Sequence, residues 1–147
     1  MLLADWRQAP KPGSSDWHWQ HFSPRELACK CRGKFCAGEY WHDPDFLDAL
    51  EDLRARMAAP LRILSAHRCA LHNASVGGAP LSQHKKIAAD VALDRHEPIA
   101  LSRAAYMAGF VGQGYYRTFI HLDRARARTW FGAGAGAKQY WVGLWSR

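Results

Sequence analysis

The sequence has no long apolar run, and this absence argues against one class of protein. No stretch approaches the roughly 20 consecutive apolar residues that a membrane-spanning helix requires, so we expect no membrane insertion. The N-terminal segment MLLADWRQAPKPGSSDW lacks a basic region followed by an apolar core, so we expect no secretory signal. The chain is then made in the cytoplasm, and another agent must deliver it if it acts outside.

Acidic residues are scarce relative to basic ones. The 147 residues include 20 Lys and Arg but only 13 Asp and Glu, which gives a formal net charge of +7. A basic surface favours polyanions such as nucleic acid, anionic lipid or the anionic polymers of a cell wall. No long Lys/Arg block or RNA-binding motif supports a nucleic-acid binder, so we expect no nucleic-acid partner.

Cysteine is limited to four residues, Cys29, Cys31, Cys36 and Cys69. The segment CKCRGKFC is not the C-x-x-C knuckle of a zinc ribbon, because its first spacing is one residue too short. Three interpretations remain open: buried or half-buried thiols, a disulfide that involves this group, and a second metal site. Four cysteines do not by themselves indicate an oxidising compartment.

Composition and local patterns indicate one folded domain. Hydrophobic residues make up 48% of the chain, enough for a compact core at this length. We expect an extended N-terminal arm over residues 1–21, a domain over 22–132, and an aromatic C-terminal tail over 133–147 that packs on the domain. The tryptophans of the arm and tail are expected to cover a small core rather than to stack on sugars.

Capping residues and prolines locate the first helices. Ser23 can cap a helix that starts at Pro24, and Asp43 with Pro44 begins a second helix that Pro60 ends. Helices and short strands interleave without a regular βαβ rhythm, so we predict an α+β fold with a small antiparallel sheet and flanking helices. The other predicted elements are strands over 61–68 and 88–94, a loop over 69–85, a helix over 94–109, and two short strands within 109–125.

Three short segments, SAHRCALHN, SQHKKIAAD and FIHLD, carry most of the unusual polar residues. Asp90 lies in an otherwise apolar strand, where an unpaired carboxylate costs several kcal/mol unless it is paired, hydrogen-bonded or bound to a metal. One sheet could bring Asp90 together with His84 and His121, and two imidazoles with one carboxylate suit an open zinc site. The alternative is that Asp90 pairs with an arginine and that the histidines are ordinary core or surface residues.

From about Phe22 to Trp130, the chain resembles the zinc D-Ala-D-Ala carboxypeptidases and the phage-type peptidoglycan endopeptidases, whose fold is shared with the hedgehog signalling domain. The segments SAHR, NASVGG, SQH, AAD and HLD occur in the order of the family pattern, and GGAPLSQH is the most specific part. The resemblance implies that His84, Asp90 and His121 bind Zn²⁺.

The resemblance also implies roles for two residues beside the metal. Arg68 falls on the family arginine that holds a substrate carboxylate or positions its peptide, a task that suits a planar guanidinium. Ser82 falls on a serine that hydrogen-bonds near the substrate. The alternatives are a structural salt bridge for Arg68 and a turn residue that bonds its own backbone for Ser82.

Two features depart from the family pattern. Asp90 is six positions after His84, where the family commonly has seven with a glycine between. A slip of one residue in a strand sends a side chain to the other face, unless a shortened loop absorbs it. Thr118 occupies the position where relatives keep a Glu or Asp as catalytic base.

Asp123 is our candidate for the missing acid. Because it lies two residues after His121, the two side chains share one face of a strand, and Asp123 could act as the base or could orient His121. The alternative is an ion pair with Arg124, Arg126 or Arg128. His67 is a second candidate for proton transfer, and Tyr115 and Tyr116 are expected to line the cleft.

The resemblance therefore implies a zinc metallopeptidase, either a D,D-carboxypeptidase or an endopeptidase, that cleaves the stem peptide or cross-link of peptidoglycan. We expect a monomer that acts at the cell wall or in the periplasm. Without a signal peptide, it fits a phage or prophage product, either an endolysin released through a holin or a virion part. The alternative is a catalytically inactive zinc module of the same fold that serves wall binding or assembly, which Thr118 favours.

Overall fold

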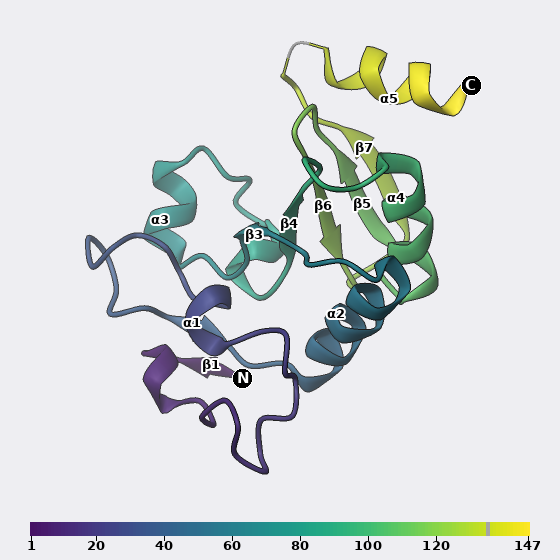
Figure 1. Ribbon diagram of the computed structural model, residues 1–147. Helices are drawn as coiled ribbons and strands as arrows, with labels where there is room; N and C mark the ends of the chain where they lie inside the picture. The colour runs from purple at the N-terminus through teal and green to yellow at the C-terminus, as the bar shows by residue number, and fades with distance from the viewer. Residues whose placement is uncertain (135) are drawn as a thin grey trace.

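The computed structural model describes residues 1–134 and 136–147 (Figure 1). Ala135, which falls in the predicted tail over 133–147, lies outside the described residues. The chain forms a single small α+β domain, as predicted, built on a five-stranded sheet with the strand order β3-β4-β6-β5-β7. The strands are β3 (Ile63–Ser65), β4 (Ala89–Ala92), β5 (Gly112–Tyr115), β6 (Phe119–Asp123) and β7 (Arg128–Phe131).

The sheet is mixed rather than antiparallel throughout. The pairs β3–β4, β4–β6 and β5–β6 are antiparallel, but β7 lies parallel to β5 at the edge of the sheet. Residues 124–127 therefore cross the end of β5 instead of forming a hairpin after β6. This crossing places Asp123 and Arg128 on either side of Gly112, with which both are in register.

Two helices cover one face of the sheet, which we call the helix face (Figure 1). They are α2 (Pro44–Met57) and α4 (Pro98–Met107). The Asp43 side chain caps α2 by accepting a hydrogen bond from the N–H of Phe46. Apolar residues at helical spacing, among them Leu50 and Leu53, then join one core with Leu101 of α4 and Ile120 of β6. Burial of this stripe fixes both helices on the sheet.

The N-terminal residues wrap around the same core. Their elements are β1 (Leu2–Leu3), η1 (Trp6–Gln8), α1 (Pro24–Leu27) and β2 (Tyr40–Trp41). Trp17 and Trp19 are both almost fully buried, and their indole N–H groups donate to the Phe22 carbonyl and the Asp48 carboxylate at 3.0 and 2.7 Å. These two tryptophans therefore belong to the core and offer no stacking platform for a sugar.

Several elements differ from the sequence-based expectation. The predicted loop over 69–85 contains α3 (Ala70–Ser75) and η2 (Gln83–Lys85), which are too short to give an apolar periodicity. The tail forms α5 (Ala137–Trp145), in which Trp141 is fully buried and donates to the Tyr116 carbonyl at 2.7 Å. Tyr115 packs against Trp141 with 4.8 Å between the ring centroids, so Tyr115 lies on the helix face, away from the face that carries His121. No helix in the described part of the chain is long and apolar enough to cross a membrane.

Candidate metal centre

The opposite face of the sheet, which we call the ligand face, carries the polar residues that the sequence singled out. Asp90 and His121 are direct cross-strand partners in the antiparallel pair β4–β6, so their side chains emerge side by side. His84 comes from η2, which precedes β4 by only a few residues. The turn after η2 absorbs the short His84–Asp90 spacing, and Asp90 faces His84 rather than the helix face.

Three ligand atoms converge in this cluster. Asp90 Oδ1 lies 3.0 Å from His84 Nε2 and 3.3 Å from His121 Nδ1, and the two imidazole nitrogens are 3.1 Å apart. His84 and His121 are buried, and Asp90 is nearly so. The structure thus brings together the three residues that the sequence predicted as metal ligands.

The remaining ring nitrogens show which atoms carry protons. His84 Nδ1 lies 2.6 Å from the Ala66 carbonyl oxygen, which can only accept, so Nδ1 carries the proton. His121 Nε2 lies 2.7 Å from Asp123 Oδ2, so the proton is on Nε2. In neutral rings, His84 Nε2 and His121 Nδ1 then present lone pairs to each other and to the Asp90 carboxylate. A cation among these three electron pairs, either a metal ion or an added proton, would remove their mutual repulsion.

The cluster fits zinc in ligand type and in dimensions. Ligands at 2.0–2.1 Å from a tetrahedral zinc stand about 3.3 Å apart, and the three observed separations lie close to this value. Two nitrogens and one oxygen also leave the fourth position of a tetrahedral ion open. Zinc would therefore be held by His84 Nε2, Asp90 and His121 Nδ1.

Asp123 supports His121 from behind. It is only 1% exposed, and besides accepting from His121 it forms a two-pronged ion pair with Arg128 at 2.7 and 2.8 Å. A carboxylate that accepts from the second nitrogen of a metal-binding histidine fixes its tautomer and orientation. The pair lies over Gly112, where an added Cβ would stand 2.3 Å from Asp123 Oδ1. Of the two roles predicted for Asp123, these contacts favour the orienting one.

The electrostatics of the cluster follow from these contacts. Burial raises the pKa of Asp90, but the His121 and His84 rings outweigh it when they carry a proton toward Asp90, and they bring the pKa down to about 2. Burial likewise raises the pKa of Asp123, and His121 and Arg128 lower it further than burial raises it. Burial lowers the pKa of His121, but Asp123 and Asp90 hold it above its usual value. Both carboxylates are thus ionised at neutral pH.

Arg68 and Ser82 lie beside the cluster. The Arg68 Nη2 donates to Ser82 Oγ at 3.4 Å, and the backbone N–H of Arg68 donates to the His84 carbonyl at 2.6 Å. Arg68 Nε is buried and has no hydrogen-bond partner among the described residues. Burial lowers the pKa of Arg68, and the Asp90 charge partly restores it. Ser82 also accepts from the N–H of His84 at 3.2 Å, so it both caps η2 and holds Arg68.

His67 and Thr118 do not face the cluster as a catalytic base would. Both ring nitrogens of His67 are occupied, one by the Lys86 carbonyl and the other by Glu39 Oε1 at 2.8 Å. These contacts suit a residue that positions its neighbours. Thr118 is exposed in the turn between β5 and β6. The roles of His67, Arg68, Ser82 and Asp123 in a reaction stay predictions.

A groove of about 300 Å³ opens next to His121. Trp130 of β7 forms one wall, with its ring centroid 5.1 Å from that of His121 and its indole N–H donating to Tyr116 at 3.2 Å. The sequence did not identify Trp130 as a groove residue. The available signal was that Trp130 lies two residues after Arg128, on the same face of a strand that was not predicted. The residues that line the groove are Ala79, Leu81, Ser82, Gln83, His121, Arg126, Arg128 and Trp130.

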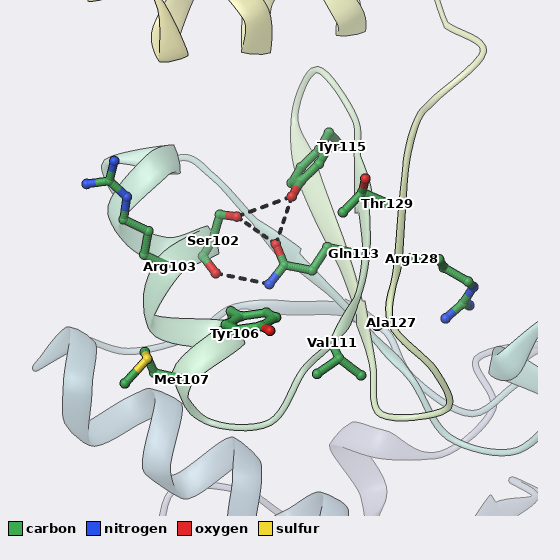
Figure 2. Close-up of a pocket in the computed structure, with 10 residues that line it drawn as sticks. All are labelled: Ser102, Arg103, Tyr106, Met107, Val111, Gln113, Tyr115, Ala127, Arg128 and Thr129. Atoms are coloured by element: carbon green, nitrogen blue, oxygen red, sulfur yellow. Dashed lines mark hydrogen bonds between the residues drawn. The ribbon is translucent and has the colours of Figure 1, made fainter.

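A larger cavity of about 570 Å³ lies on the helix face, between α4 and strands β5 and β7 (Figure 2). Three of its polar side chains bond to one another: Ser102 donates to Gln113 at 2.6 Å, and the Tyr115 hydroxyl donates to the same amide oxygen at 3.1 Å. Figure 2 shows these three side chains pointing toward one another while Arg128 turns away. The sheet separates this cavity from the metal ligands.

Comparison with known protein families gives one match. Residues 20–123 match the family model described as Peptidase M15, a range that includes His84, Asp90, His121 and Asp123 but ends before Arg128 and Trp130 of β7. No curated protein matches the chain.

Proposed function

The chain belongs to the peptidase M15 family, whose members are zinc-dependent, and we propose that it cleaves peptide bonds in the stem peptide or cross-link of bacterial peptidoglycan. One observation carries the proposal: His84, Asp90 and His121 direct three electron pairs at one point beside an open groove. Zinc bound there would supply a Lewis acid that polarises a scissile carbonyl and activates water.

The chain's own residues supply orientation and charge complementarity. His121 is held by Asp123, so its Nδ1 keeps its direction when a substrate enters. Arg68 offers a buried guanidinium nitrogen without a partner among the described residues, which suits a peptide carbonyl or a terminal carboxylate. With Arg126 and Arg128 along the groove, the site favours a peptide that carries negative charge, as stem peptides do.

Purified peptidoglycan tests the substrate directly. We expect the zinc-loaded protein to release products that mass spectrometry assigns to one peptide bond, and we expect Asp90→Ala to release none. Asp94→Ala is the matched control, because Asp94 is a half-exposed carboxylate that pairs with Arg62 far from the groove. Free D-alanine would identify a carboxypeptidase, and a new internal amine without free D-alanine would identify an endopeptidase. Zinc binding without any product would contradict the proposed substrate.

A catalytically inactive zinc module for wall binding or assembly is the second proposal. It is favoured by the groove lining, which includes no Asp or Glu within the described part of the chain, and by the engagement of Asp123 with His121 and Arg128. Sedimentation of the protein with peptidoglycan, without any cleavage, would support it. In either case we propose that the protein acts at the cell wall or in the periplasm; an active enzyme would be an endolysin released through a holin or part of a virion, and an inactive module would be part of a virion.

A further inference from the structure

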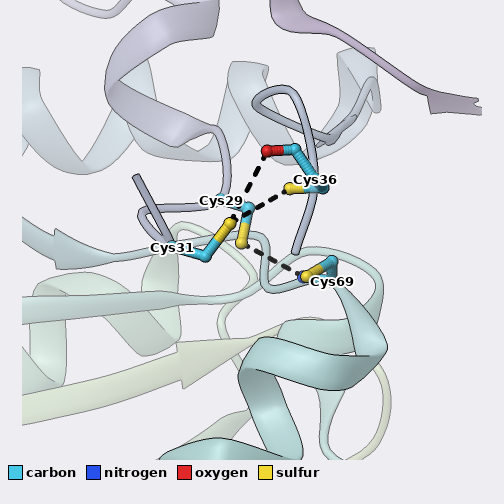
Figure 3. Close-up of side chains that lie close together, drawn as sticks. All are labelled: Cys29, Cys31, Cys36 and Cys69. Carbon is cyan, nitrogen blue, oxygen red and sulfur yellow. Dashed lines mark hydrogen bonds between the residues drawn. The ribbon is translucent and has the colours of Figure 1, made fainter. Parts of the chain in front are cut away.

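The four cysteines gather at a second place in the fold, outside the groove. Cys29, Cys31 and Cys36 lie on the segment that follows α1, and Cys69 is the N-cap residue of α3. All four sulfur atoms lie within 4.8 Å of one another, and Figure 3 shows them turned toward a common centre. Three of the cysteines are buried and Cys36 is half-buried.

The separations suit a single metal ion. Sulfurs at 2.3 Å from a tetrahedral zinc stand about 3.8 Å apart. The Cys31 and Cys36 sulfurs are 3.5 Å apart, near this value and far from the roughly 2.05 Å of a disulfide bond. An iron–sulfur cluster would spread its thiolates further, because several metal atoms and sulfides lie between them. Four thiolates in tetrahedral array are the usual ligands of structural zinc.

Backbone N–H groups point at the sulfur atoms, as they do around metal-bound thiolates. The N–H groups of Cys69, Glu39 and His72 donate to the sulfurs of Cys29, Cys36 and Cys69 at 3.4, 3.3 and 3.4 Å, respectively.

The charge around the cluster has the complementary sign. Zinc with four thiolates carries a net charge of −2, and Lys30, Arg32 and Lys34 alternate with the cysteines on the exposed side of the same segment. Basic neighbours lower the cost of keeping such a charge close to the surface. They also explain why the segment is both rich in cysteine and strongly basic.

Apolar packing alone does not hold this segment in place. The cysteines form a small cluster separate from the main core, with Phe35 as the one larger apolar residue packed against it among the described residues. Arg32 and Gly33 both have positive φ, at 58° and 80°, so the backbone also turns through a conformation that arginine rarely adopts. A cross-link through the cysteines would offset part of the entropy cost of keeping this turn ordered.

We propose that Cys29, Cys31, Cys36 and Cys69 bind a second zinc ion with a structural role. This ion ties the segment after α1 to the start of α3, across 40 residues of sequence between Cys29 and Cys69. Because Cys69 directly follows Arg68, the ion would also anchor Arg68 beside the groove, where its side chain donates to Ser82. The protein therefore carries one zinc in the groove and one in the cysteine cluster.

Elemental analysis of four purified proteins tests the count. We expect two zinc ions per chain in the wild type, one in Asp90→Ala, one in Cys69→Ser and two in Lys138→Ser, a control at an exposed lysine of α5 outside both clusters. One zinc in the wild type and none in Asp90→Ala would overturn the cysteine site. One zinc in the wild type that persists in Asp90→Ala but not in Cys69→Ser would instead contradict the groove site and leave the cysteine site standing.

A second measurement does not depend on the folding of a cysteine variant. We expect cobalt-substituted Asp90→Ala to show the intense charge-transfer absorption of thiolate-bound cobalt, and we expect its thiols to resist alkylation until a chelator is added. All four cysteines should then react without any reductant. Thiols that stay unreactive after chelation and denaturation, and react only after reduction, would show disulfides and overturn the proposal.

Discussion

Replacing Asp123 by Asn removes one charge behind the metal centre while keeping the size of the side chain. Oδ2 accepts from both His121 Nε2 and Arg128 Nη2 at 2.7 Å, and Oδ1 accepts from Arg128 Nη1 and the Ala125 N–H at 2.8 and 3.1 Å. An amide offers only one oxygen. If the NH₂ group takes the place of Oδ1, it faces the Arg128 Nη1 and Ala125 N–H donors. If it takes the place of Oδ2, it faces the His121 Nε2 and Arg128 Nη2 donors.

The second orientation has a chemical consequence for the metal. An NH₂ group opposite His121 Nε2 favours the tautomer with the proton on Nδ1, the atom that would bind zinc. Loss of a charge-assisted hydrogen bond costs about 1.5–3 kcal/mol. Loss of a partner behind a metal-binding histidine weakens metal binding by roughly 10- to 100-fold, which is about 1.4–2.7 kcal/mol. We therefore expect Asp123→Asn to weaken zinc binding by roughly this factor.

Competition with a chromophoric chelator measures the zinc dissociation constant, and turnover at saturating zinc measures catalysis separately. Asp94→Asn is the control, because its pair with Arg62 is half-exposed and contributes about 1 kcal/mol or less. Wild-type zinc affinity in Asp123→Asn, combined with lost turnover, would refute the orienting role and would identify Asp123 as the base. If Asp123→Asn kept both the wild-type zinc affinity and the wild-type turnover, Asp123 would have neither an orienting nor a catalytic role.

Three further predictions concern binding and stability. Arg68→Lys should lower kcat/KM by roughly 10- to 100-fold with zinc content unchanged, because lysine cannot reproduce the guanidinium contacts; unchanged kinetics on peptides with a free carboxylate would contradict this. Gly112→Ala should destabilise the fold by about 1–3 kcal/mol and weaken zinc binding, because the added Cβ would meet the Asp123 carboxylate. Thermal unfolding measures the loss of stability. Gly143→Ala is the control and should show no such loss, because its Cβ would meet open space. Leu50→Ala should cost about 2–5 kcal/mol in denaturant unfolding, because Leu50 is fully buried, and a loss below 1 kcal/mol would contradict the packing described.

The sequence was most informative where local signals and ordered motifs coincide. The Asp43 cap and the prolines located α2 to within a few residues, because capping chemistry is local. The order of the short motifs selected His84, Asp90 and His121 together. Strand alternation also placed Asp123 on the same face as His121, since a period of two residues holds wherever a strand forms.

The features that the sequence did not reveal depend on long-range pairing. Strand β7 has no alternation strong enough to predict it, and it becomes a strand because β5 offers a free edge in parallel register. The sequence therefore did not indicate that Trp130 lines the groove. The cysteine cluster was also not predictable from local sequence. The spacing within CKCRGKFC gives no information on Cys69, which lies beside the other three only in the tertiary fold.

The parallel pairing of β7 with β5 also sets an order of events during folding. The β5–β6 hairpin and its pairing with β4 complete the ligand set, whereas β7 can dock only after its connection has crossed the end of that hairpin. We therefore expect His121 to approach His84 and Asp90 before Arg128 closes over Asp123. We expect refolding with zinc to show a fast phase of metal capture, followed by a slower protection of the β7 backbone amides from hydrogen exchange. Simultaneous phases would show that the edge strand docks together with the rest of the sheet.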